Sequence, residues 1–174
     1  MKSSHLKKKV ALFGGSFNPP HEGHREILKR LARRKSIDEV WVLPVYKHAF
    51  HKEMAPFKLR KELCEFYLKP IHEKVKIKEE EKKLGGVSFT YRLVRHLQQK
   101  HPKIDFIWVV GEDAYEKRQL WRNSDKLEKC IKFLVFPRGK ESPIPDVSST
   151  ELRKTLGKYS LVSMKKWYEK NTKG

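Results

Sequence analysis

The stretch KVALFGGSFNPPHEGHREI, residues 9–27, decides the fold of this chain. Its apolar run at residues 10–13 predicts a buried strand, which breaks at the glycine pair of residues 14–15. The Asn-Pro-Pro triplet at residues 18–20 predicts a rigid turn, and an amphipathic helix is expected to open at His21. The apolar face of that helix is expected to hold Ile27, Leu28 and Leu31.

A strand, a glycine turn and a helix start in this order predict a site for an anion. The first turn of a helix leaves backbone N–H groups unpaired and carries roughly half an elementary positive charge. Paired glycines let a phosphate approach the backbone. The stretch has neither the GK[ST] ending of a Walker loop nor the spacing GxGxxG. His21 and His24, three residues apart, are therefore the side chains expected to meet the phosphate.

Two segments carry a resemblance to a known family. The segment GGSFNPPHEGH, residues 14–24, resembles the (H/T)xGH signature of the nucleotidyltransferase superfamily and is most similar to the nicotinate or nicotinamide mononucleotide adenylyltransferases. The segment VSSTELR, residues 147–153, resembles the ISSTxIR segment of the same family. Each alone has a simpler explanation, because the histidines would cap a helix and Ser148 with Glu151 matches a capping box. Their joint occurrence favours the nucleotidyltransferase interpretation.

The rest of the chain alternates predicted strands with predicted helices. Strands are expected at residues 39–45, at 75–77 on an edge of the sheet, at 104–111 in its centre, and within 131–139. Helices are expected at residues 57–68, from Ser88 as N-cap to about 100, and once or twice within 154–174. The charged run EEEKK at residues 79–83 is predicted as a solvated loop. The alternation and the resemblance together predict an α/β fold, a Rossmann-like doubly wound parallel sheet of about five strands with helices on both faces.

Length and composition favour one domain over residues 1–174, which the resemblance identifies as a nucleotidyltransferase domain. A flexible basic N-terminus is expected at 1–8 and a C-terminal packing helix at 158–174. Cys64 and Cys130 lack the spacing of metal ligands and favour a reducing compartment. No apolar run is long enough for a signal peptide or a membrane span. We therefore expect a cytoplasmic protein that has no membrane partner, and the sequence makes no prediction of its oligomeric state.

The chain has 40 Lys and Arg against 21 Asp and Glu, a formal net charge of +19. This charge predicts anionic partners. The basic residues are spread along the chain, which favours a solvated surface that steers phosphorylated substrates. Contact with nucleic acid is then expected only through non-specific charge, and a specific nucleic-acid or nucleotide-binding protein is the alternative from a different class.

The resemblance implies three groups of site residues. The catalytic residues would be His21, His24 and Arg153. ATP would contact Gly14, Gly15, Ser16, Phe17, Lys52, Ser148, Ser149 and Thr150. The mononucleotide would contact Phe89, Thr90, Gly111, Asp113, Trp121 and Arg138. No protein ligand to a metal is expected, because Mg²⁺ would ride on the triphosphate.

The activity implied by the resemblance is adenylyl transfer from ATP to nicotinate mononucleotide, forming deamido-NAD, an NAD-type dinucleotide, and pyrophosphate. The acceptor's own phosphate would attack, so no activated nucleophile is needed. The family's Tyr is Phe89 here and its acidic residue is Arg92, which bears on the choice of acceptor. Alternatives are the same reaction on nicotinamide mononucleotide, or a phosphopantetheine adenylyltransferase or cytidylyltransferase.

Overall fold

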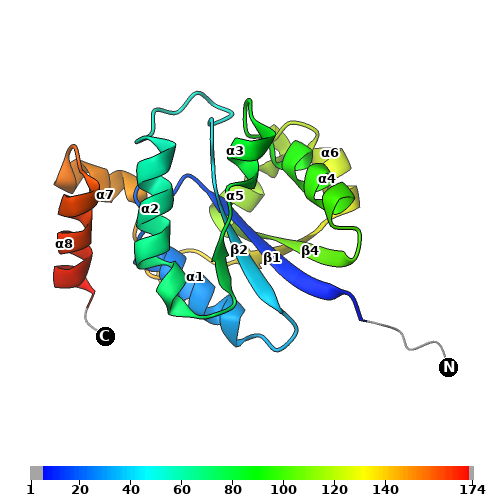
Figure 1. Cartoon of the computed structure of the whole chain (residues 1–174), viewed down its shortest axis with the longest axis horizontal. Coiled ribbons are helices and arrows are strands. Elements are labelled where there is room, and N and C mark those ends of the chain that lie inside the picture. The colour runs from blue at the N-terminus through cyan, green and yellow to red at the C-terminus, as the bar shows by residue number, and fades with distance from the viewer. Residues whose placement is uncertain (1–5, 173–174) are drawn as a thin grey trace.

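A five-stranded parallel sheet forms the centre of the structure, a computed structural model that describes residues 6–172. The strands lie in the order β3-β2-β1-β4-β5 (Figure 1). Their bounds are β1 Lys8–Gly15, β2 Glu39–Pro44, β3 Val75–Ile77, β4 Ile104–Gly111 and β5 Lys132–Phe136. The predicted parallel sheet of five strands is confirmed, with β3 on the expected edge. The predicted basic N-terminus lies outside the described residues up to residue 5, and Lys8 already belongs to β1.

Helices cover both faces of the sheet, as expected for a doubly wound fold. The helices are α1 Glu22–Arg33, α2 Phe57–Tyr67, α3 Glu80–Leu84, α4 Thr90–Lys100, α5 Glu112–Glu116, α6 Ser124–Cys130, α7 Ser149–Leu156 and α8 Leu161–Asn171. There are also two short 3₁₀ helices. The first, η1 Lys69–Ile71, follows α2, and the second, η2 Arg118–Leu120, lies between α5 and α6. One face carries α1 and α2, with α8 packed on the outer side of α2, and the other face carries α4 and α6 (Figure 1). Within residues 6–172 no helix is both long and apolar enough to cross a membrane.

Strand β1 takes the middle of the sheet, where β4 was expected. Its side chains alternate between two cores, with Ala11 and Phe13 against α1 and α2 and Val10 and Leu12 against α4. All four are buried, which explains the unbroken apolar run in the sequence. The longer apolar run of β4 is also interior, between β1 and β5. The apolar runs of β1 and β4 are therefore both typical of strands covered on two faces. The length of the run did not indicate which of the two strands is the central one.

The connections reverse direction between β1 and β4. The chain leaves β1 through α1 to β2 and β3 on one side, then crosses through α4 to β4 and β5 on the other. In open parallel sheets this reversal opens a crevice beyond the carboxyl ends of the two strands, where ligands bind. Both the glycine pair after β1 and Gly111 at the end of β4 lie at that edge.

The charged run at residues 79–83 is not a solvated loop, and that prediction is wrong. Residues 80–84 form α3, and the carboxylates of Glu80 and Glu81 are buried. Glu80 pairs with Lys83 at 3.3 Å and with Lys100 at 3.1 Å. Glu81 accepts a hydrogen bond from the Tyr46 N–H at 3.3 Å, and its burial raises its pKa to about 7. The two carboxylates can be buried because partners distant in sequence pair with them or hydrogen-bond to them. The run of charges in the sequence gives no indication of these partners.

Ser88 does not cap α4 as predicted. The N-cap is Phe89, whose side chain makes no capping bond. The Ser88 hydroxyl instead accepts the Tyr46 N–H at 3.2 Å, and the Ser88 N–H donates to the Lys47 carbonyl at 2.8 Å. Ser88 therefore joins the entry of α4 to the loop that leaves β2, an attachment that local sequence could not reveal.

Arg60 on α2 ties three segments together through its guanidinium. It is 1% exposed and donates to the carbonyls of Ser16 and Val45 at 2.7 Å each, and to that of Ala55 at 2.8 Å. These carbonyls follow β1, follow β2 and precede α2. Burial lowers the pKa of Arg60, while the nearby Glu81 charge acts in the opposite direction. The bond set fixes the loops at the carboxyl edge of the sheet.

Replacing Arg60 with methionine, which is of similar length but has no donor, leaves three acceptors unpaired. Because a buried unpaired acceptor costs about 1–3 kcal/mol, we expect the free energy of unfolding in urea to fall by about 3–5 kcal/mol. Lys58→Met removes a cation from the exposed side of the same helix, and should cost less than about 0.5 kcal/mol. Equal losses in the two variants would contradict the role given to Arg60.

Candidate functional site

The turn at residues 16–20 brings the two sequence motifs into contact. Arg153 Nη1 donates to the Asn18 carbonyl at 2.6 Å, and the Ser149 hydroxyl donates to the Pro19 carbonyl at 2.7 Å. These bonds join residues 130 and 135 positions apart in the chain. The segments that resemble one family therefore form one structural unit beyond the carboxyl end of β1.

The same turn is also held from α8 and from the loops that contain Ala55 and Tyr159. Tyr168 on α8 donates its hydroxyl to the Pro20 carbonyl at 2.7 Å, and its ring stacks on Tyr67 of α2 with centroids 3.8 Å apart. The Asn18 side-chain oxygen accepts from the Ala55 N–H at 3.1 Å and from the Tyr159 hydroxyl. The C-terminal helix is thus part of the support of the site, which its apolar stripe in the sequence did not reveal.

His21 and His24 meet as the sequence predicted. Their rings stack with centroids 3.7 Å apart and planes 22° from parallel. The Nδ1 atom of His24 accepts the His21 backbone N–H at 3.0 Å. In a neutral imidazole the second nitrogen then carries the proton, so His24 Nε2 is a hydrogen-bond donor. His21 Nδ1 is buried and has no hydrogen-bond partner within residues 6–172.

Both imidazoles are neutral at pH 7. Burial, with the charge of Arg138 acting in the same direction, lowers the pKa of His21 to about 4. Burial also holds the pKa of His24 well below 6.5, with His21 and Arg138 adding to the effect. The pair therefore offers neutral N–H donors to an anion, in a setting where the positive charge comes from arginine.

The glycines of the motif make room for rings. A Cβ on Gly23 would lie 2.9 Å from His21 Cε1, so the small residue between the two histidines lets them stack. A Cβ on Gly14 would lie 2.7 Å from the Trp108 ring, and one on Gly15 would lie 3.2 Å from the Phe17 ring. The Cβ directions of residues 14 and 15 therefore meet packed aromatic rings. The sequence interpretation, which used glycine only for backbone access, missed this requirement.

Phe17 lies beneath the histidines. Its ring is 1% exposed and packs edge-on against His24 with centroids 4.8 Å apart. It also packs against Phe13 of β1 at 5.5 Å. Contact between Phe17 and a ligand would therefore pass through its backbone rather than its side chain.

The second motif lies at the start of α7. The Ser148 hydroxyl accepts the Glu151 N–H at 3.2 Å and caps the helix as predicted. Arg153 Nη2 donates to the Thr150 hydroxyl at 3.2 Å. Arg153 thus uses two of the five N–H donors of a guanidinium within the motif and the turn. Lys52 lies in the loop after β2, close to Arg153. Burial and the charge of Arg153 both lower the pKa of Lys52.

Gly111, Asp113 and Arg138 also come together, at the ends of β4 and β5. The Arg138 N–H donates to Glu112 Oε2 at 3.0 Å, which joins the exit of β5 to α5. Arg138 Nε lies 3.8 Å from Asp113 Oδ2, and the Asp113 side chain is 70% exposed. A Cβ on Gly111 would lie 3.7 Å from Arg138 Nε. Arg138 is therefore close to the exposed carboxylate, and its charge also acts on the histidine pair.

Phe89, Thr90 and Trp121 line a cavity of about 260 Å³, which we call the ring cavity. Its aromatic walls suit a planar ring, which stacks favourably on Trp. Sequence reasoning missed His48 and Arg122 on its wall, since neither lies in a recognised motif. The ring cavity is lined by Val45, His48, Ala49, Phe50, Ser88, Phe89, Thr90, Leu120, Trp121 and Arg122.

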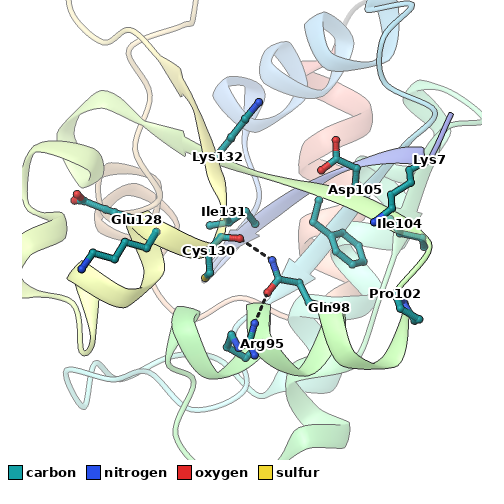
Figure 2. A pocket seen from close by; sticks show the side chains of 12 residues that line it. Lys7, Arg95, Gln98, Pro102, Ile104, Asp105, Glu128, Cys130, Ile131 and Lys132 are labelled. Carbon is teal, nitrogen blue, oxygen red and sulfur yellow. Dashed lines mark hydrogen bonds between the residues drawn. The ribbon is translucent and has the colours of Figure 1, made fainter. Parts of the chain in front are cut away.

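A larger hollow of about 690 Å³ lies at the amino ends of β4 and β5. Figure 2 shows Gln98 donating to the Cys130 carbonyl at 2.8 Å across it, with Arg95 donating to Gln98 at 3.2 Å. None of the predicted site residues lines this hollow. Parallel sheets bind ligands at the opposite edge, so the hollow is not the candidate site.

Within residues 6–172 no group of three or more His, Cys, Asp and Glu side chains is arranged to hold a metal ion. The site is instead rich in cations, with Arg138 near the histidines and Lys52 near Arg153. Such a set of side chains fits a polyanion such as a polyphosphate.

The chain matches the family model described as cytidylyltransferase-like over residues 12–155. A curated relative from Anaeromyxobacter dehalogenans strain 2CP-C, named "probable nicotinate-nucleotide adenylyltransferase", is 34% identical over 160 residues, covering 87% of this chain and 85% of the relative. A relative of the same name from Myxococcus xanthus strain DK1622 is 30% identical over 156 residues, covering 86% and 82%.

The fold is also found among solved structures. The Plasmodium falciparum nicotinic acid mononucleotide adenylyltransferase complexed with NaAD has a TM-score of 0.75 and 22% identity, with 92% of this chain and 89% of that chain covered. The same protein complexed with APC has a TM-score of 0.70, also at 22% identity, with 88% and 86% covered. These matches confirm the predicted fold class.

The neutral histidines make the stability of the fold depend on pH. An unfolded histidine takes up a proton at about pH 6.5, whereas the pKa of His21 in the fold is about 4. As the pH falls from 7 to 4, the unfolded chain therefore binds more protons and the free energy of unfolding decreases. We expect urea titrations to show a smaller decrease in His21→Gln, which lacks this proton site. Parallel curves for the two proteins would contradict the burial of a neutral imidazole.

Proposed function

Because the chain belongs to the cytidylyltransferase-like family, alongside relatives named nicotinate-nucleotide adenylyltransferases, we propose that it transfers the adenylyl group of ATP to nicotinate mononucleotide. The products are deamido-NAD, which is nicotinate adenine dinucleotide, and pyrophosphate. The observation that carries the proposal is the contact between the two motifs. The turn at residues 16–20 joins the stacked histidines to Arg153, and a ring-sized cavity is present beside the loop that leaves β2.

The reaction needs charge neutralisation and positioning more than a protein nucleophile. A phosphate oxygen of the mononucleotide attacks the α-phosphorus of ATP, a new P–O bond forms, and the bond from the α-phosphorus to the bridging oxygen breaks. The electron pair leaves with pyrophosphate. Negative charge grows on the α-phosphoryl oxygens and on the leaving group, and fixed donors at those oxygens lower the barrier.

His24 is suited to the α-phosphoryl oxygens, because its Nδ1 is occupied by the His21 backbone and its Nε2 carries a proton. His21 would donate beside it. A phosphate next to these imidazoles stabilises their charged form, so binding ATP raises their pKa values from the low values of the free protein. The two imidazoles would therefore become easier to protonate as negative charge grows on the phosphoryl oxygens, and a protonated imidazole stabilises that charge more strongly.

The β- and γ-phosphates would meet Lys52 and the remaining N–H donors of Arg153. The backbone of residues 14–17 and the start of α7 would supply further donors. Ser149 donates its hydroxyl hydrogen to Pro19, so its contribution is to hold the turn rather than to donate to phosphate. Mg²⁺ enters with ATP as the substrate MgATP, and the chain's own residues need only hold the triphosphate.

The mononucleotide would lie across the ends of β4 and β5. Its ring would stack on Trp121 with Phe89 and Thr90 beside it, its ribose would meet Gly111 and Asp113, and its phosphate would meet Arg138. We also propose a cytoplasmic location, in keeping with Cys64 and Cys130, which are both free thiols.

The first test is an assay of the purified chain with MgATP and either nicotinate mononucleotide or nicotinamide mononucleotide. We expect dinucleotide and pyrophosphate in equal amounts, with a larger kcat/KM for the nicotinate substrate. Absence of product from both, with ATP still bound, would contradict the proposed acceptor. A larger kcat/KM for the nicotinamide substrate would overturn the choice of nicotinate.

His24→Ala should lower kcat by about 10²–10³, because it removes one donor to the transition state. His72→Ala is the matched control, since His72 is exposed on the loop before β3, and it should keep the rate of the unmodified chain. Circular dichroism checks that both variants are folded. Unchanged turnover in folded His24→Ala would remove this histidine from the mechanism.

A further inference from the structure

Arg122 lies on the wall of the ring cavity beside Trp121. Both belong to the short turn that links η2 to α6, closed by a hydrogen bond from the Ser124 N–H to the Trp121 carbonyl at 3.2 Å. Asn123 in this turn has the left-handed φ of 59°, which redirects the chain into α6. The turn therefore places two consecutive residues, Trp121 and Arg122, on the wall of the ring cavity, and Arg122 also lines a neighbouring hollow of about 750 Å³.

The guanidinium of Arg122 is held without using its hydrogen-bond donors. Its central carbon lies 5.0 Å from the centroid of the Phe89 ring, a cation–π contact that orients the side chain. Arg118, four residues earlier, pairs with Glu128 at 2.6 Å. Arg122 has no hydrogen bond or ion pair with another residue between positions 6 and 172. Its donors are therefore free for a ligand.

The ring cavity is positively charged only at this residue. Arg122 is the one Lys or Arg on the described lining, and that lining contains no Asp or Glu. His48 is also on the wall, and burial with the charges of Lys52 and Arg60 lowers its pKa. An anionic group on a ring in this cavity would thus meet one full positive charge without a competing carboxylate.

We propose that Arg122 binds the ring carboxylate of nicotinate mononucleotide and thereby selects it over nicotinamide mononucleotide, an inference that rests on the proposed function. The two substrates share ring, ribose and phosphate and differ only in a carboxylate against a carboxamide. A guanidinium matches a carboxylate with two parallel N–H···O bonds. The carboxamide offers one oxygen acceptor, and its NH₂ group would face the remaining donors.

The test is the ratio of kcat/KM for the nicotinate substrate to that for the nicotinamide substrate, measured in Arg122→Gln and in the unmodified chain. Because Arg122→Gln removes the charge-assisted, bidentate pair with the carboxylate, we expect this ratio to fall tenfold or more. Lost packing on Phe89 would lower both constants together and leave the ratio unchanged. Arg122→Lys keeps the charge without the planar fork and should give an intermediate ratio.

Arg95→Gln is the matched control. Arg95 lies on α4 and donates to Gln98 beside the hollow at the amino ends of β4 and β5 (Figure 2), outside the ring cavity. The ratio of the two kcat/KM values in Arg95→Gln should equal the ratio in the unmodified chain. Calorimetric titration with nicotinate mononucleotide alone gives a readout independent of turnover, and Arg122→Gln should bind it at least tenfold more weakly.

The outcomes separate the inference from the proposed function. Dinucleotide formation by the unmodified chain, with the same substrate ratio in Arg122→Gln, overturns the role of Arg122 and leaves the proposed function standing. Failure of the unmodified chain to form dinucleotide from either substrate overturns the proposed function itself. A reduced ratio in Arg122→Gln, with Arg95→Gln unchanged, supports the assignment.

Discussion

The site depends on how the carbonyl oxygens of one turn are satisfied. A glycine strand end followed by Asn-Pro-Pro has few internal hydrogen bonds, so its oxygens need donors from elsewhere. Arg60 supplies them after β1 and β2, and Arg153, Ser149 and Tyr168 supply them in the turn itself. With its acceptors occupied by the protein, the turn has its shape before a ligand arrives. Donors fixed in advance need no reorganisation during the reaction, which is the main source of electrostatic catalysis.

Burial and the charge of nearby arginine act in the same direction on the histidines at this edge of the sheet, since both lower their pKa values. The chain carries a formal net charge of +19, yet its two motif histidines are neutral because they are packed between Phe17 and the start of α1. Arginine provides permanent charge around them. The same division holds in the ring cavity, where His48 has a lowered pKa and Arg122 carries the charge. In both places, therefore, arginine carries the permanent positive charge and a neutral histidine supplies the hydrogen-bonding imidazole.

Sequence reasoning predicted the sheet and the motifs because both are encoded locally. Apolar runs marked β1 and β4, helical spacing marked α1, and the family resemblance indicated which loops meet. It failed where a partner distant in sequence changes the meaning of a residue. Glu80 and Glu81 are buried through Lys100 and Tyr46, and Ser88 bonds to the loop after β2 instead of capping α4. The packing that demands Gly14 comes from Trp108 on β4, which no local pattern indicates.

The hydrogen bond from Tyr168 to Pro20 joins residues 148 positions apart. The ribosome releases the strand, turn and histidines first, and the donors that fix the turn from α7 and α8 follow 130 to 148 residues later. A nascent chain would therefore hold the proposed phosphate site incomplete until α8 has been synthesised. Closing such long loops is entropically costly and slow compared with forming local helices. In the growing chain, competence to bind nucleotide at the proposed site would then arise when α7 and α8 dock on the turn, rather than with the motif itself.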